Sequence, residues 1–250
     1  MADEFDALET AIAPLRASGL DVSLFDSAVN DIKTRYIKKL PEYFQRIGYL
    51  RYLATDPKTI IDIGVSTGTP KLYEAFNHLP FLLVDPQRNS EQKLKYKPAK
   101  YTFVEKGLGA ERGTLTLNES ASQSSFIERD GVFVGDYKVE SQYEVDVITF
   151  KDMIDSYKPE PPYGVKIDTE GFELEVVKGM VGAFDDIDFL ICETSIRRVY
   201  RDSYQFSELV AFLANHGLLF YNILNDVSPW PRYYDTVFLR KDNPKFTSVT

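Results

Sequence analysis

Short apolar runs alternate with longer amphipathic stretches from Thr59 to the C-terminal part of the chain. Between two of these runs, the residues from Ser203 to His216 repeat apolar positions at helical spacing and predict a helix that stops at Gly217. Strands that alternate with helices are typical of a mostly parallel sheet with helices on both faces, so we predict an α/β fold. The expected strands are Thr59 to Ile63, Phe81 to Val84, Tyr101 to Val104, Val165 to Ile167, Phe189 to Cys192, Leu218 to Ile223 and Thr236 to Leu239.

The first 55 residues follow a different pattern, in which apolar side chains recur at helical spacing. We predict a helical extension over residues 1–55 and one α/β domain over residues 56–250, because 250 residues suffice for one well-buried domain. The extension either caps the sheet, covers the substrate or contributes to a homo-oligomer. Its apolar positions are Leu8, Ile12, Leu15, Phe25, Val29, Ile32, Tyr43, Ile47, Leu50 and Leu53.

The stretch from Gly113 to Tyr157 departs from this alternation and is interpreted as an insertion. Within it, Thr149 and Asp152 have the spacing of a helix capping pair and predict a short helix that runs to Tyr157. The β-like runs of the insertion are Thr114 to Leu117, Val132 to Val134 and Tyr143 to Ile148, and its polar loop is Ala121 to Phe126.

Composition and charge narrow the classes of partner and compartment. The net charge of −9 disfavours nucleic acid as a partner, because nucleic-acid binding needs a basic surface. A single cysteine, Cys192, excludes an intrachain disulfide and favours a reducing compartment, for which the cytoplasm is the default. The acidic N-terminus does not read as a secretory signal, and no apolar run reaches the roughly 18 residues of a membrane span.

A glycine turn follows the first predicted strand and is the first candidate ligand site. Gly64 and Gly68 permit a tight turn and close approach of the backbone to a ligand, with Ser66 and Thr67 between them. The third glycine of the dinucleotide fingerprint is missing, which disfavours a nicotinamide oxidoreductase and favours a smaller, carboxylate-bearing ligand. The turn alone is also compatible with a purely structural connection between strand and helix.

Two further strands end in residues suited to a nucleoside. Asp85 lies 21 positions after Gly64, where an acid can accept both hydroxyls of a ribose, although it could also be a solvated loop acid before Pro86. Gly107 to Gly109 form a small turn against which an adenine ring could lie, with Leu108 as its apolar neighbour.

Three acids follow the next two strands at the edge of the sheet where ligands bind in open α/β folds: Asp168, Glu170 and Glu193. Any of them, with a pKa raised by burial, is a candidate general base. Glu170 could instead stabilise a helix N-terminus. A hard divalent cation is possible but not predicted, and a zinc site is improbable without a nearby histidine. Gly171 is expected to start a helix in which Phe172, Val176, Val177 and Met180 face the sheet, and Glu173, Glu175 and Lys178 the solvent.

In this order, the segments IIDIGVSTG, VDP, VKIDTEGFELEVVKGM and ICET resemble the FkbM family of S-adenosylmethionine-dependent methyltransferases. The Asp-x-Glu-Gly core with its amphipathic helix is the most specific part, and the resemblance covers about Thr59 to Ser195. The family commonly has Ala-Asn at Val65 and Ser66 and Glu-Pro at Asp85 and Pro86, so this chain departs from it in both places. Both departures retain a small polar side chain and a carboxylate.

The resemblance implies a class I methyltransferase fold, with seven strands of which the last is antiparallel, and methyl transfer to a hydroxyl oxygen. It implies that Asp62, Gly64, Ser66 and Gly68 surround the methionine part of the cofactor, that Asp85 binds its ribose and Leu108 its adenine, and that Asp168 lies near the reacting centre. We favour a sugar hydroxyl as acceptor, contacted by the SQSSF loop and by Trp230, Tyr233 and Tyr234. The alternatives are a polyketide or other natural product, or a module that binds the cofactor without catalysis.

Overall fold

The computed structural model describes most of the predicted α/β domain and a few residues before it. The described ranges are 13–14, 16–18, 22–23, 26–27, 42–120, 123–129, 138–197, 199–225 and 231–247. Several predictions therefore lie outside the described residues, namely those for Leu8, Ile12, Leu15, Phe25, Val29, Ile32, Val132 to Val134 and Trp230.

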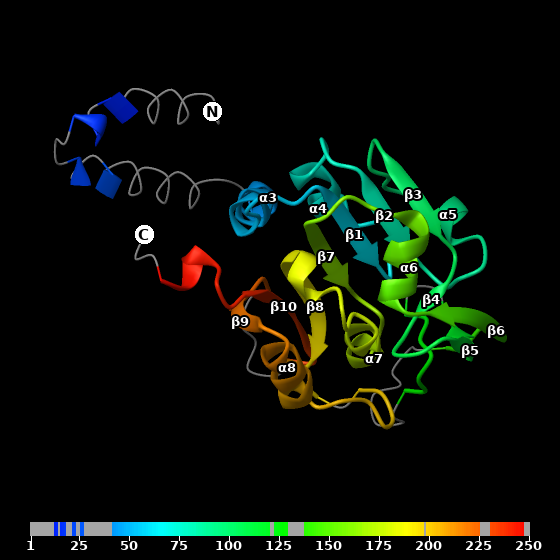
Figure 1. The fold of residues 1–250 in the computed structure, drawn as a ribbon. Coiled ribbons are helices and arrows are strands. Elements are labelled where there is room, and N and C mark those ends of the chain that lie inside the picture. The colour runs from blue at the N-terminus through cyan, green and yellow to red at the C-terminus, as the bar shows by residue number, and fades with distance from the viewer. Residues whose placement is uncertain are drawn as a thin grey trace.

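A seven-stranded sheet forms the centre of the domain, with the strand order β3-β2-β1-β7-β8-β10-β9 (Figure 1). The first five strands of this order are parallel, whereas β10 is antiparallel to both of its neighbours. The predicted fold class is confirmed, including the antiparallel last strand. The strands are β1 (Thr59–Ile63), β2 (Phe81–Val84), β3 (Tyr101–Val104), β7 (Tyr163–Ile167), β8 (Ile187–Ser195), β9 (Leu218–Ile223) and β10 (Tyr233–Arg240).

Two strands of the predicted insertion, together with residues 107–108 just before it, form a second, three-stranded sheet beside the main one. Its strands β4 (Gly107–Leu108), β5 (Gly113–Glu119) and β6 (Ser141–Ile148) are ordered β4-β6-β5. Helix α6 (Phe150–Tyr157) returns the chain to the main sheet, and the expected capping box of Thr149 and Asp152 opens it.

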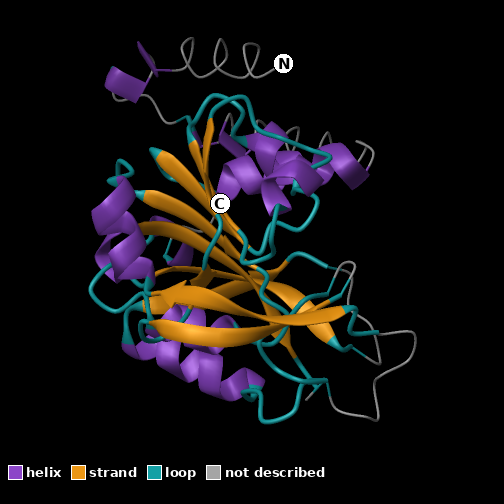
Figure 2. Cartoon of the chain, turned by 90° about the vertical axis from the view of Figure 1, so that its right-hand side faces the viewer, coloured by secondary structure: helices purple, strands orange, loops and turns teal. Residues whose placement is uncertain are grey.

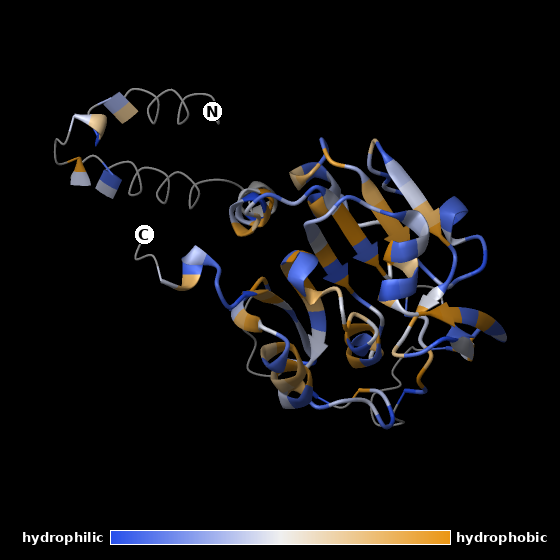
Figure 3. Cartoon of the chain, viewed as in Figure 1, coloured by the Kyte–Doolittle hydropathy of each residue, from blue (hydrophilic) through white to orange (hydrophobic). Residues whose placement is uncertain are grey.

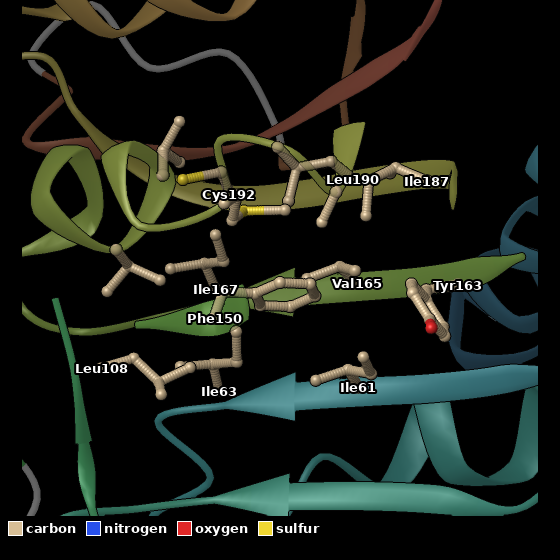
Figure 4. Packing of buried hydrophobic residues seen from close by; sticks show 14 of the residues in the cluster. Ile61, Ile63, Leu108, Phe150, Tyr163, Val165, Ile167, Ile187, Leu190 and Cys192 are labelled. Carbon is tan, nitrogen blue, oxygen red and sulfur yellow. The ribbon is translucent and has the colours of Figure 1, made fainter. Parts of the chain in front are cut away.

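Helices cover both faces of the main sheet and bury a separate apolar cluster on each (Figure 2). One face packs against α6, α7 (Glu173–Lys178) and α8 (Phe206–Asn215), and Figure 4 shows part of this cluster. The other face packs against α3 (Glu42–Leu53) and α4 (Pro70–Ala75). The remaining elements are α5 (Ser90–Lys93) and the short 3-10 helices Phe184–Asp186 and Pro244–Phe246.

Side chains of the central strands alternate between these two clusters, and several charged residues interrupt the apolar pattern of the face under α3 and α4. Ile61 and Ile63 of β1 belong to the cluster under α6, whereas Ile60 belongs to the cluster under α3 and α4. By the same alternation, the face under α3 and α4 receives the charged side chains of Asp62, Lys166, Glu193 and Asp235. Figure 3 shows the hydrophobic strands at the centre and hydrophilic residues around them.

The strand order reverses between β1 and β7, because the chain runs outward through β2 and β3 before it returns to β7. A crevice forms at such a point beyond the carboxyl ends of the strands, and it is where open α/β sheets bind ligands. Among the described residues, no helix is both long enough and apolar enough to cross a membrane.

Candidate active site

The glycine turn after β1 lies directly against the chain that leaves β7. Gly64 has a φ of +79°, and a Cβ at this position would lie 1.7 Å from the carbonyl oxygen of Asp168. Only glycine allows so close an approach in this left-handed conformation. The turn therefore brings Asp168 beside the first strand, which explains the requirement for Gly64.

Asp85, at the end of β2, is fixed by two backbone donors of the neighbouring loops. The amide of Ser66 donates to its Oδ2 atom at 2.9 Å, and the amide of Gln87 donates to its Oδ1 atom at 2.9 Å. The side chain is buried, and burial raises its pKa to about 6. The Asp85 carboxylate thus fixes the glycine turn, and its remaining lone pairs can accept hydrogen bonds from a ligand's hydroxyl groups.

A cavity of about 100 Å³ lies at this point and brings together six of the predicted site residues. Small-molecule pockets usually measure roughly 300–1,000 Å³, so binding of a nucleoside-sized ligand requires the walls of this cavity to move apart. Ser124, Ser125 and Phe126 of the SQSSF loop form one of these walls, so the predicted acceptor loop faces the predicted cofactor site. The predicted residues that line the cavity are Gly64, Ser66, Asp85, Leu108, Asp168 and Glu170.

Four other predicted residues do not line this cavity. Asp62 is fully buried beneath α4, where the hydroxyl of Tyr73 donates to its Oδ2 atom at 2.8 Å. Thr67 and Gly68 contact the segment after α5. The carbonyl of Thr67 accepts the amides of Lys95 and Tyr96 at 2.9 and 3.1 Å, and a Cβ at Gly68 would lie 2.4 Å from the carbonyl oxygen of Tyr96. Glu193 lies beside the cavity, in the acidic cluster described next.

Asp168, Glu170 and Glu193 form one cluster, in which a carboxylate oxygen from each lies within 4.8 Å of the others. Burial, together with the charges of Asp168 and Glu170, raises the pKa of Glu193 to about 10. Burial also raises the pKa of Glu170 to about 7. Lys166 donates to Asp168 at 2.8 Å and is one cation next to the cluster. Repulsion in such a cluster is relieved either by retained protons or by a hard cation with oxygen ligands.

Glu173 corrects the expectation that this side chain faces the solvent, because it is 1 % exposed. Its Oε1 atom accepts the amides of Thr169 and Gly171, each at 3.0 Å, and its Oε2 atom accepts the hydroxyl of Tyr204 at 2.9 Å. The carboxylate therefore fixes the loop that carries Asp168 and Glu170. An acid at the first position of a helix is the sequence signal for this role.

Tyr200 and Arg129 complete the surroundings of Glu170 and were not identified from the sequence. The hydroxyl of Tyr200 donates to Oε2 of Glu170, and a guanidinium nitrogen of Arg129 lies 3.9 Å from the same oxygen. Glu170 itself has a φ of +52°, an unfavourable value for a residue other than glycine, and the hydroxyl of Ser125 donates to its carbonyl at 2.7 Å. Contacts from two distant segments thus hold this carboxylate in one place.

The aromatic residues that were predicted to contact the acceptor differ in their exposure. Tyr233 is 48 % exposed at the start of β10, whereas Tyr234 is buried. Trp230 lies outside the described residues.

Comparison with known proteins places the chain in a family. The model of the Methyltransferase FkbM domain matches residues 23–220. The hexuronic acid methyltransferase AglP of Haloferax volcanii is 34% identical over 79 residues, which cover 31% of this chain and 33% of that protein. This chain therefore matches only about one third of that relative's length. A TehB-like SAM-dependent methyltransferase of Corynebacterium glutamicum is similar with a TM-score of 0.38 and 11% identity, over 96% of this chain and 100% of the other. Because the family model spans most of the sequence, the chain belongs to the FkbM methyltransferase family.

Proposed function

We propose that this protein transfers a methyl group from S-adenosylmethionine to a hydroxyl oxygen of a sugar. The observation that carries the proposal is the placement of Asp85, Gly64 and the Asp168 to Glu170 loop around one cavity at the strand-order reversal. This arrangement provides a ribose acceptor, a backbone surface and carboxylates on successive elements of one site.

In the proposed complex, the cofactor lies across the carboxyl ends of β2, β1 and β7. Asp85 accepts the two ribose hydroxyls, and Leu108 contacts the adenine. The turn at Gly64 and Ser66 faces the methionine part, and Asp168 lies nearest to the sulfonium. Asp62, Thr67 and Gly68 stabilise this turn on the side away from the cofactor.

The chemical step in this proposal is an in-line displacement. The acceptor oxygen forms a bond to the methyl carbon, the bond between this carbon and sulfur breaks, and S-adenosylhomocysteine leaves with the bonding electron pair. The hydroxyl proton passes to Glu170, whose pKa of about 7 suits a general base at neutral pH. Glu193, whose pKa is raised to about 10 by burial and by the neighbouring carboxylates, retains its proton and does not act as the base. Positioning of the two reactants provides much of the acceleration.

A sugar acceptor is favoured by the printed name of the Haloferax relative, which is a hexuronic acid methyltransferase. A polyketide hydroxyl would use the same displacement and the same base, so the two acceptors differ in their contacts only.

The proposal is tested by two measurements on the full chain. Calorimetry should show binding of S-adenosylmethionine and no comparable binding of NAD. Incubation with a panel of sugars and polyphenols should release S-adenosylhomocysteine with a sugar only. Binding of the cofactor without its turnover on any hydroxylated compound would identify a binding module instead of an enzyme.

A further inference from the structure

A second cavity lies on the face of the sheet under α3 and α4, and the cofactor assignment does not use it. Its volume is about 290 Å³, which is close to the lower limit of small-molecule pockets, roughly 300 Å³, and sufficient for a compact ligand such as one sugar ring. Its walls come from α3, the start of α4, β7, β8 and β10, and its lining includes Leu50, Thr69 and Ile191.

The charged groups of this cavity are opposite in sign to those of the cofactor cavity. Arg46, Lys71 and Lys166 line it together with one carboxylate, Asp235. Among the described residues, the cofactor cavity instead has the acids Asp85, Asp168 and Glu170 and the one cation Lys106. A concentration of cations is unexpected in a chain with a net charge of −9, and it favours an anionic ligand.

Lys166 and Arg46 differ in how closely carboxylates of the protein approach them. Lys166 donates to Asp168 at 2.8 Å and lies 4.0 Å from Asp62, so its charge is balanced within the protein. Arg46 lies 3.8 Å from Asp235, which is longer than a direct hydrogen bond, and its side chain is 20 % exposed. The Arg46 guanidinium therefore retains donors that can form a fork with a carboxylate ligand.

The Lys166–Asp168 pair lies between the two cavities, because Lys166 lines one cavity and Asp168 lines the other. Asp85 is on β2, whereas the second cavity lies over β7, β8 and β10, further along the strand order. With strands about 4.8 Å apart, β8 lies roughly 14 Å from β2. A ligand in the second cavity thus approaches Asp168 from the side opposite the ribose, as the second substrate of a transfer reaction must.

We propose that the cavity of Arg46, Lys71 and Lys166 binds the carboxylate of an acidic sugar and so selects a uronic acid as the methyl acceptor. This inference rests on the proposed function and specifies its substrate class. Arg46 and Lys71 hold the carboxylate, and a hydroxyl of the same ring is directed toward Asp168 and Glu170. The methyl group is transferred to the oxygen of that hydroxyl, and the bonds that form and break are those of the displacement described above.

The test compares two acceptors that differ only in charge, p-nitrophenyl glucuronide and p-nitrophenyl glucoside. Wild-type protein should methylate the glucuronide with the lower KM. Arg46→Gln and Lys71→Gln should each raise the KM for the glucuronide by roughly tenfold or more, because each removes a charge-assisted contact, and should leave the KM for the glucoside unchanged. Lys151→Gln, on the exposed side of α6, is the matched control and should change neither value.

Calorimetry with S-adenosylhomocysteine distinguishes a sugar carboxylate in this cavity from the methionine carboxylate of the cofactor. Its Kd should be the same in wild type, Arg46→Gln and Lys71→Gln. A weakened Kd in both variants would overturn the inference, since the cavity would then hold the methionine carboxylate of the cofactor. Equal methylation of the two sugars would overturn it as well, but would leave the proposed function intact. If neither sugar is methylated, the proposed function fails. Calorimetry of the glucuronide with the cofactor-bound protein then still tests the anion site. Binding to the wild type that is lost in Arg46→Gln supports the site, and no binding to the wild type overturns it.

Discussion

Replacement of Asp85 by asparagine tests the ribose assignment. The variant Asp85→Asn has nearly the same shape but no charge, and its amide nitrogen replaces one of the two oxygens. In the native protein these oxygens accept the amides of Ser66 and Gln87, each at 2.9 Å. The asparagine can therefore accept only one of these bonds, and it presents a weaker acceptor to the ribose.

The expected loss follows from the energy of hydrogen bonds to charged groups, about 1.5–3 kcal/mol each. The asparagine oxygen still accepts one ribose hydroxyl, so we expect the loss of one such bond. The Kd for S-adenosylhomocysteine should then rise by roughly 10- to 150-fold.

Calorimetry with two ligands separates this effect from a general distortion of the turn. The second ligand is the analogue of S-adenosylhomocysteine that lacks both ribose hydroxyls. Asp85→Asn should weaken the natural ligand strongly and the analogue little, while Asp185→Asn, at a fully exposed position, should affect neither. An equal loss for both ligands, or no loss for either, would refute the ribose assignment.

Three further predictions concern the loop after β7. With Glu170 as the base, kcat should rise as the pH increases through about 7, because the carboxylate accepts a proton only after it ionises; Glu170→Gln should abolish this rise in the pH profile of the rate. Gly64→Ala should lower the Tm far more than Gly182→Ala: both glycines have positive φ, but only the added Cβ at Gly64 would meet another atom, the carbonyl oxygen of Asp168. Glu173→Gln should lower the free energy of unfolding by about 1–3 kcal/mol in urea titrations, and lower kcat, because it weakens the bonds that fix the loop.

Each of these predictions has a specific contrary result. A pH profile that is unchanged in Glu170→Gln would assign the base elsewhere, and activity lost to EDTA and restored by Mg²⁺ would show a cation in the acidic cluster. Equal Tm values for the two alanine variants would mean that the turn can move away from Asp168. For Glu173→Gln, Glu175→Gln is the control, and an equal effect of both would contradict the buried role of Glu173.

The central strands were predictable because each is a short apolar run bounded by polar turns. β1, β2, β3 and β9 coincide with their predicted ranges, whereas β8 extends beyond its apolar part at both ends. The extra residues of β8 include Glu193, which pairs with Asp235 of β10 in the register of the sheet. Pairing with a neighbour, and not apolar character, extends the strand there.

The site was predictable where residues follow strand ends, since the parallel order brings these ends together. It was not predictable where distant segments meet. Arg129 belongs to the insertion and Tyr200 to the loop after β8, and an isolated bridge between them places both beside Glu170. Glu173 was assigned to the solvent because its helix was expected to begin at Gly171; the helix begins at Glu173 itself, so this side chain turns back to the loop.

The second cavity had a sequence signal that was not used. Asp235 shares its strand face with the apolar Val237 and Leu239, and period-two alternation places both Lys166 and Asp235 on the face of Asp62. Charged residues at buried strand positions indicate either a balanced ion pair or a ligand site. Lys166 is balanced by two carboxylates, whereas Arg46 lies 3.8 Å from Asp235, so the ligand must be sought at Arg46.

The central claim is methyl transfer from S-adenosylmethionine to a sugar oxygen, and the most direct test follows the methyl carbon itself. The protein is incubated with p-nitrophenyl glucuronide and with cofactor labelled with carbon-13 in its methyl group, and the products are read by NMR. We predict one labelled methoxy group, formed from a hydroxyl group of the sugar, for each S-adenosylhomocysteine formed. Label that remains on the cofactor, or that appears on carbon or nitrogen, would contradict the account.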